Sequence, residues 1–290
     1  MSMALMSGAA LAEEAGSRKG HGHFGVGYQY IHVDGFESSI GELPIGTVDT
    51  HTIIFDVEYY LTDRWTLMAD IPIVRKRYQG PGPHDPLALD PPKPNVKNVD
   101  DGKYRTTWQD IHLGVRYLAK TGPLEIEPFI ALGVPSNDYP FFGHAAAGQN
   151  LVKLDVGSRF AYRPPISDAF YSAEISYVFI EETLGQSIDH WRIHADAGYI
   201  FSDRMSARVF TIFTKGNGLS FPDDFPPPRT TEKWYQHDRL VKHNYGNVGI
   251  GVDWLASEKI QVSTAAMTMV WADQVHDLEY ALIVAVNFSF

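Results

Sequence analysis

Apolar and polar residues alternate along most of this 290-residue chain, and this period of two restricts its fold more than any other feature. From Ile53 to Leu61 every odd position is apolar, whereas Asp56 and Glu58 lie among the even positions. Successive side chains of a β-strand point to opposite faces, so the pattern predicts a strand with one apolar and one polar face. The segment from Trp65 repeats the pattern after three residues, which is hairpin spacing.

Twelve such strands are expected along the chain. They fall at about 23–33, 51–61, 65–77, 108–118, 124–134, 150–162, 169–180, 189–200, 205–215, 244–254, 259–271 and 277–290. Short connections at 62–64, 119–123, 163–168, 201–204 and 255–258 alternate with longer ones at 34–50, 78–107, 135–149, 181–188, 216–243 and 272–276. Pro72 and Pro128 fall inside predicted strands, and a β-bulge is expected at each.

An even strand number with alternating short and long connections is typical of outer-membrane barrels. The sequence therefore predicts an all-β chain that forms a transmembrane antiparallel up-and-down β-barrel of about 12 strands, with residues 13–290 as one domain. A soluble β-sandwich is the alternative, because it would bury the apolar face in a core.

Composition excludes several other classes of protein. The 24 basic and 35 acidic residues give a net charge of -11, which argues against nucleic acid as a partner. The absence of cysteine excludes disulfide scaffolds and thiolate chemistry. No run of 18 apolar residues follows the N-terminus, which excludes a helical membrane span.

Residues 1–12 form a short apolar run that ends in Ala10-Leu11-Ala12. Small residues in an A-x-A arrangement are typical of a signal-peptide cleavage site, so this segment is predicted to be the remnant of a secretory signal. The run lacks basic residues at its start, and a disordered tail is the alternative.

Charged residues are confined to one face of the predicted strands. A basic residue that faces lipid at mid-membrane costs about 2–4 kcal/mol, so the uncharged face, which carries Val115 and Ile250, is expected to contact lipid. The opposite face is predicted to line the lumen with Asp56, Glu58, Asp70, Asp110, His112, Arg116, Glu125, Glu127, Lys153, Asp155, Arg159, Glu174, His190, Arg192, His194, Asp196 and Asp253.

With Arg208 and Glu279, the predicted charged face holds eleven acids and five bases. This excess would disfavour anionic solutes and favour neutral or cationic ones. A lattice of ion pairs that stabilises the barrel is the alternative interpretation. The same face carries glycines that either widen the lumen or leave space for neighbouring aromatic rings: Gly25, Gly27, Gly114, Gly157, Gly198, Gly249 and Gly251.

Histidines on this face raise the question of a metal site. His190, His194 and Asp196 share one predicted strand, and Asp110 and His112 share another. Residues two apart along a strand lie about 7 Å from one another, so a neighbouring strand would have to supply further ligands. A polar lumen wall is the preferred interpretation, and no metal, cofactor or catalytic residue is predicted.

Aromatic residues gather near the strand ends, as in the interfacial belts of membrane proteins. Those near the short turns are Tyr59, Trp65, Tyr117, Tyr162, Tyr199, Trp254 and Phe288. Those near the other ends are Tyr30, Trp108, Phe179, Trp191, Phe213 and Trp271. The last strand ends at Phe290, which resembles the terminal signal read by the outer-membrane assembly machinery.

Several motifs resemble those of the meta-pathway phenol degradation family of outer-membrane proteins. The stretch from Trp108 to Tyr117 is similar to the family's G-D-x-x-L-G-x-K-Y strand, and 135–139 is similar to its P-T-G-D-Y loop entry. The turns at 61–65 and 201–205 resemble its L-T-D-R hairpins. Gln109, Arg116 and Ser136-Asn137 depart from the family pattern. The resemblance covers most of residues 23–290 and implies a transporter of hydrophobic or aromatic molecules.

The leading functional hypothesis is a bacterial outer-membrane channel for small molecules, by passive diffusion through or beside a narrow acidic lumen. A closed structural or adhesion barrel is the alternative. An outer-membrane lipid-acting enzyme is disfavoured, because the chain has no His-x-Ser sequence of the kind that a twelve-stranded phospholipase family uses. The expected partners are membrane lipid, the assembly machinery through Phe290, and the solute.

Overall fold

The computed structural model describes residues 17–290, so the predicted signal remnant at 1–12 lies outside the described residues. The strands are β1 (Gly22–Ser38), β2 (Gly41–Tyr60), β3 (Trp65–Gln79), β4 (Arg105–Trp108), β5 (Asp110–Tyr117), β6 (Leu124–Pro135), β7 (Lys153–Tyr162), β8 (Ala169–Ile180), β9 (His190–Ser202), β10 (Met205–Gly216), β11 (Asn244–Ser257), β12 (Ile260–Asp273) and β13 (Val275–Ser289). Three short helices, η1 (Pro86–Ala88), α1 (Glu232–Tyr235) and η2 (His237–Arg239), lie between strands. Within residues 17–290, no helix is long and apolar enough to cross a membrane.

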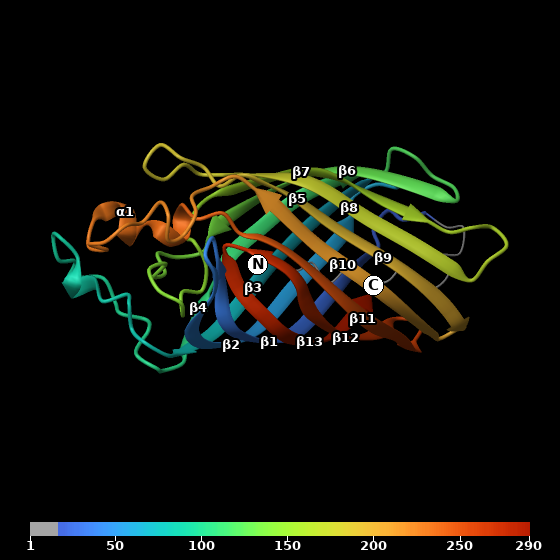
Figure 1. Ribbon diagram of the computed structural model, residues 1–290. Coiled ribbons are helices and arrows are strands. Elements are labelled where there is room, and N and C mark those ends of the chain that lie inside the picture. The colour runs from blue at the N-terminus through green and yellow to red at the C-terminus, as the bar shows by residue number, and fades with distance from the viewer. Residues whose placement is uncertain (1–16) are drawn as a thin grey trace.

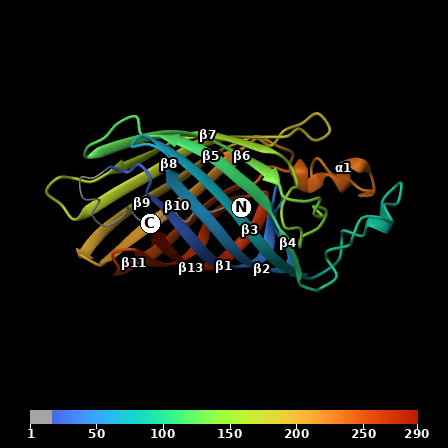
Figure 2. The ribbon, with the colours of Figure 1, turned by 180° about the vertical axis from the view of Figure 1, so that it is seen from behind.

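The sheet is closed and antiparallel, as predicted. Sequential strands pair with one another, and β1 also pairs with β13 from His23↔Ser289 to Glu37↔Val275 (Figures 1 and 2). Both β4 and β5 pair with β3, so together they occupy the position of one strand, and the barrel has twelve strands. Pairing of the first strand with the last closes the sheet, which a membrane-spanning sheet requires because lipid offers no hydrogen-bond partner.

Each of the two strand prolines has a bulge on the segment opposite it. Between β4 and β5 one extra residue stands opposite β3 at Pro72, and the Gln109 amide donates to the Pro72 carbonyl at 2.9 Å. The bulge predicted at Pro128 is likewise found on the neighbouring segment. Pro128 pairs with Ser158 in unbroken register on one side. On its other side the pairing passes from Arg116↔Phe129 to Lys120↔Ile126, so one extra residue stands opposite Glu127 and Pro128, and the amides of Ala119 and Lys120 both donate to the Ile126 carbonyl.

The two ends of the barrel differ. Tight turns join strands at one end, whereas the long connections at 80–104, 136–152 and 217–243 fold together at the end where α1 lies (Figure 1). The predicted loop at 34–50 was wrong, because β1 and β2 continue as a hairpin with only residues 39 and 40 between them. Glycines at 35, 41 and 46 interrupt the apolar alternation there, but the backbone ladder does not depend on side chains.

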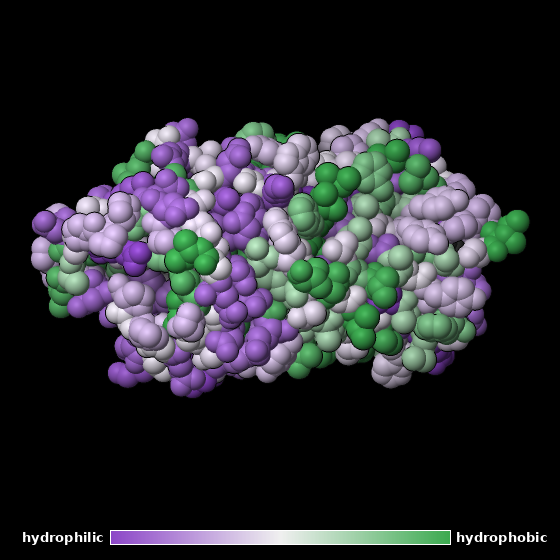
Figure 3. Space-filling model, in the orientation of Figure 1, coloured by the Kyte–Doolittle hydropathy of each residue, from purple (hydrophilic) through white to green (hydrophobic). Residues whose placement is uncertain are grey.

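The outer surface carries the large exposed apolar side chains. Ile250 at the middle of β11 is 65% exposed, and Leu113 and Val209 are each more than half exposed. Hydrophobic residues gather over the barrel strands, and hydrophilic residues gather over the loop end (Figure 3). Such a band facing outward on a closed barrel has the arrangement of a lipid-facing surface.

Aromatic side chains on the outer surface meet in pairs near both strand ends. Trp65 and Tyr117 have ring centroids 4.8 Å apart at the short-turn end. Phe213 and Trp271 stack at 5.4 Å near the loop end. Trp65 and Trp271 are 46% and 40% exposed, so both rings are positioned to contact a membrane interface.

Candidate functional site: the barrel interior and the loops at one end

The charged residues on the inner side of the sheet are joined across strands. Arg116 on β5 reaches past β3 to Glu58 on β2, with 2.8 Å between its guanidinium and the Glu58 carboxylate. It also contacts Glu127 on β6 at 3.4 Å. Glu127 has two further guanidinium partners, Arg18 and Arg159, each at 3.5 Å. Arg116 is 6% exposed and Glu127 is 4% exposed, so this group lies within the protein rather than in open water.

A second group lies on β7 to β11. The Arg208 guanidinium contacts Asp196 at 2.7 Å and Asp253 at 3.4 Å, so one base on β10 joins acids on both neighbouring strands. Asp196 also lies 3.4 Å from the His194 ring. On the same side of the sheet, Arg192 pairs with Asp155 and lies 3.6 Å from Glu174.

A third group lies closer to the loop end. Lys153 pairs with Asp110 at 3.0 Å, and the Tyr139 hydroxyl donates to the other oxygen of the same carboxylate. His112 on β5 contacts Asp70 on β3 at 2.9 Å. Asp110 is 1% exposed, which shows that the polar interior is densely filled at this level.

Three other residues predicted for the lumen have different surroundings. His190 contacts the Ile188 carbonyl through its Nδ1 at 3.2 Å, and Glu125 is half-buried on β6. Asp56 is half-buried on β2, and its carboxylate lies against the Gly25 backbone. Within residues 17–290 no basic side chain forms an ion pair with Asp56.

The inward position expected for Glu279 was wrong. β13 pairs His32↔Tyr280 and then Val33↔Leu278, so Glu279 is skipped as a bulge residue. Its side chain is 51% exposed and lies 3.7 Å from His32. An extra residue reverses the facing of those beyond it, so ten acids and five bases of the predicted set remain, and Lys76 and Arg18 are two further bases on the inner side.

The inner glycines do not widen the interior where aromatic rings cover them. A Cβ atom built at Gly198 would overlap the Phe170 ring, and one at Gly249 would overlap the Phe210 ring. These two glycines therefore leave space for neighbouring rings, which was the second of the two interpretations of the pattern.

Two of the long loops enter the barrel. Val99 from 80–104 and Ala145 from 136–152 are buried in one apolar cluster with barrel residues that include Phe210, Met267 and Ala281. Loop carbonyls also bind the wall. Lys76 on β3 donates to the Ala146 carbonyl at 2.9 Å.

A second apolar cluster joins the three loops to one another. It contains Leu89, Phe141, Phe142, Phe225, Trp234, Leu240 and Val241. Arg239 of the third loop donates to the Gln149 carbonyl of the second at 2.7 Å. The same guanidinium lies 3.3 Å from the Phe141 ring centroid. We call this assembly of 80–104, 136–152 and 217–243 the loop plug.

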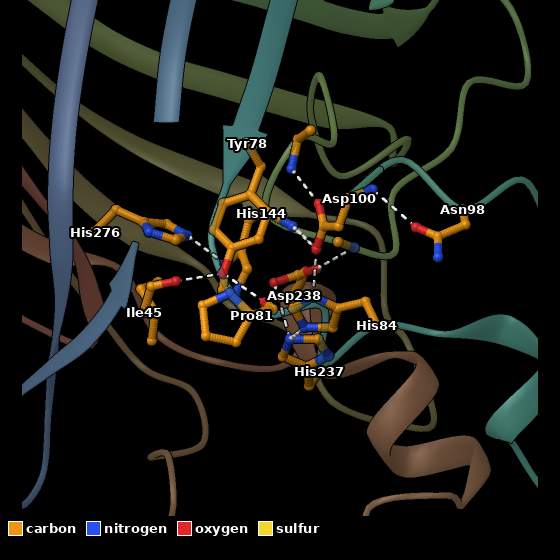
Figure 4. A network of polar contacts seen from close by, with 12 residues as sticks. Ile45, Tyr78, Pro81, His84, Asn98, Asp100, His144, His237, Asp238 and His276 are labelled. Atoms are coloured by element: carbon orange, nitrogen blue, oxygen red, sulfur yellow. Dashed lines mark hydrogen bonds and ion pairs between the residues drawn. The ribbon is translucent and has the colours of Figure 1, made fainter. Parts of the chain in front are cut away.

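Imidazoles and carboxylates meet inside the loop plug. His84, His144 and His237 come from the three different loops and lie beside Asp100 and Asp238 (Figure 4). Burial lowers the pKa of His237 below its ordinary value. Burial and the neighbouring histidines also lower the pKa of His144, so the charged form of both rings is disfavoured.

The sequence interpretation did not identify this cluster. One signal was available, because each of the three long predicted connections contains histidine and alternate connections of an up-and-down barrel emerge at the same end. Alternation alone cannot show which loop residues turn inward, since loops have no fixed period.

Solved structures share this architecture. An outer-membrane channel from Pseudomonas putida F1 aligns over 98% of this chain and 99% of its own, with a TM-score of 0.71 and 14% sequence identity. The NanC porin aligns over 92% and 98%, with a TM-score of 0.52 and 8% identity. The translocator domain of the autotransporter NalP from Neisseria meningitidis aligns over 97% and 91%, with a TM-score of 0.52 and 11% identity.

No protein-family model and no curated protein sequence matches the chain. At these identities the likeness is one of fold. It shows a closed twelve-stranded barrel of the kind found in outer-membrane proteins.

Proposed function

We propose that the protein is a channel of the bacterial outer membrane for small molecules. The carrying observation is a closed barrel with an apolar outer surface and an inner side whose charged residues are joined across strands. An apolar exterior suits lipid, and charged groups inside suit a water-accessible path. Comparable folds in an outer-membrane channel and a porin support a transport role rather than a catalytic one.

The proposed solutes are small hydrophobic or aromatic compounds. The resemblance of 108–117 and 135–139 to the phenol-degradation family suggests this class, and those segments form β4–β5 and the β6–loop junction. Phe141, Phe225 and Trp234 of the loop plug are buried in its apolar cluster, so an aromatic solute would meet these rings when the loops move apart. Uptake of radiolabelled aromatic compounds into proteoliposomes, compared with protein-free vesicles, tests the solute class.

A structural barrel without transport is the second candidate. Its support is the dense pairing of buried charges, such as Arg208 with Asp196 and Asp253. Paired charges stabilise a barrel whether or not solute passes through it. Flux through inserted protein separates the two candidates, because only the channel admits solute.

Ion selectivity is expected to follow the acidic excess. Small cations should pass more easily than small anions, and the preference should shrink as salt rises, since screening acts over about 10 Å at 0.1 M. Asp56→Asn should reduce the cation preference, because Asp56 lacks a basic partner within the described part of the chain. Reversal potentials across a salt gradient measure the ratio.

Asp203→Asn is the matched control for charge. Asp203 is exposed in the turn between β9 and β10, so its loss should leave selectivity close to wild type. An anion-selective pore, or equal effects of the two substitutions, would reject an acidic lumen.

We also propose that Phe290 is the contact for the outer-membrane assembly machinery. Its backbone already forms two 3.0 Å hydrogen bonds with Gly22 at the seam, whereas its side chain is 51% exposed. Phe290→Asp should therefore lower the amount of heat-modifiable, membrane-integrated protein. Ile166→Asp places the same charge on a fully exposed turn residue and should assemble normally. Equal assembly of both variants would contradict the proposed contact.

A further inference from the structure

The histidine cluster of the loop plug brings two imidazole nitrogens to the separation expected for two ligands of one metal ion. Asp100 accepts from His84 Nδ1 at 2.7 Å, and the Trp234 carbonyl accepts from His237 Nδ1 at 2.7 Å. An ionised carboxylate and a carbonyl can only accept, so both Nδ1 atoms carry the proton. The two Nε2 atoms of these rings lie 3.2 Å apart. Either a proton shared between them or a metal ion bound to both accounts for this separation.

We propose that the loop plug binds a divalent transition-metal ion, such as Zn²⁺, through His84 Nε2 and His237 Nε2. Zinc–nitrogen bonds of about 2.0–2.1 Å at a tetrahedral angle place two nitrogens about 3.3 Å apart, which matches the observed 3.2 Å. Asp238 is the carboxylate beside this pair of nitrogens, because its Oδ1 lies 3.2 Å from His237 Nε2. Its other oxygen accepts from the Gly143 amide at 3.2 Å, which orients the carboxylate.

The partners of the two Nδ1 atoms fit this assignment. Histidines that bind metal donate their other N–H to a carboxylate or a backbone carbonyl, which fixes the tautomer and the ring orientation. Asp100 holds His84 in this way, and its own oxygens accept from the backbone amides of His144 and Ala145 at 3.0 and 2.9 Å. Asp100 is therefore a positioning residue rather than a ligand.

A neighbouring arrangement is less favourable. His84, Asp100 and His144 also offer ligand atoms within 4.8 Å of one another. An ion at the His84 Nδ1 side would require that atom to give up its proton and its 2.7 Å hydrogen bond to Asp100. The Nε2 side requires no such change.

The Asp238 side chain gives the ion a route from solvent. It is 31% exposed, whereas the His84 side chain is 1% exposed. The site lies between loop 80–104 and loop 217–243, so a bound ion would cross-link these two loops of the loop plug. This consequence for gating rests on the proposed channel function, but the binding itself does not.

Metal binding is tested on the full chain, without a histidine tag, refolded in detergent. Titration with Co²⁺ should give the d–d absorption of a tetrahedral site at one equivalent, and Zn²⁺ should displace it. Calorimetry with Zn²⁺ gives the affinity. His84→Gln and His237→Gln should each weaken Zn²⁺ binding more than about 100-fold, and Asp100→Asn should weaken it about 10–100-fold.

Three further variants make the result specific. His21 is exposed near the short-turn end, so His21→Gln should bind like wild type. His144→Gln should also retain the ion. If His144→Gln instead loses the ion and His237→Gln retains it, the assignment of the ligands is overturned. Asp238→Asn should weaken binding and keep the Co²⁺ stoichiometry at one.

Heat-modifiable migration identifies variants that are folded, and only those are compared. Wild-type protein that binds no Co²⁺ or Zn²⁺ overturns the proposal, as does equal binding by folded His21, His84 and His237 variants. Solute flux is measured in a separate experiment, so the metal-binding result can be interpreted even if the channel proposal fails. Ion binding without flux would support the site and contradict the channel.

Discussion

Replacing Arg116 with methionine should destabilise the barrel by about 3–5 kcal/mol, because breaking a buried ion pair leaves an uncompensated charge. Arg116 is 6% exposed, and its guanidinium is 2.8 Å from Glu58. Glu127 keeps Arg18 and Arg159 as partners, so the loss falls mainly on Glu58. Reversible chemical unfolding in lipid vesicles measures the change in the free energy of unfolding.

The double variant Arg116→Met/Glu58→Gln separates charge from packing. It should recover at least half of the loss, because no carboxylate is left without a base at this position. If the two substitutions instead add their costs, the pair contributes through packing and not through charge compensation.

Ile250→Arg should destabilise the inserted barrel by about 2–4 kcal/mol, since a basic residue at the bilayer midplane must leave water. Ile250 lies at the middle of β11 and is 65% exposed. Phe201→Arg is a matched control, because Phe201 is also 65% exposed but lies one residue from the end of β9. Near the interface the same change should cost about 0–1 kcal/mol. Equal unfolding free energies for the two variants would contradict the assigned depth of Ile250.

The strands and the two faces of the sheet were predictable because each has a local signal. Alternation fixes which side of a strand a residue occupies, and Ile250 and Arg116 both lie on the expected sides. Glu279 was misplaced because one bulge reverses the parity, and the sequence gives no mark of that extra residue. The continuous hairpin of β1 and β2 was missed because glycines conceal the pattern while the backbone pairing continues.

The partners of the inner charges could not be derived in the same way. Arg116 contacts Glu58 across an intervening strand, so the pair depends on side-chain length and on the register of three strands together. The loop plug depends on contacts such as that of Ala145 with the barrel wall, and these have no periodic signature. Sequence alone therefore predicted a lumen but not what fills its loop end.

Single-channel conductance in planar bilayers tests most directly the proposal that this barrel is a channel covered by the loop plug. Wild-type protein should conduct weakly, and Phe142→Ala/Trp234→Ala should conduct severalfold more, because both residues are buried in the cluster that joins the loops. Leu184→Ala is the control, since Leu184 is 57% exposed outside that cluster and should match wild type. Folded, inserted protein that stays closed in all three forms would contradict the channel and favour the structural barrel.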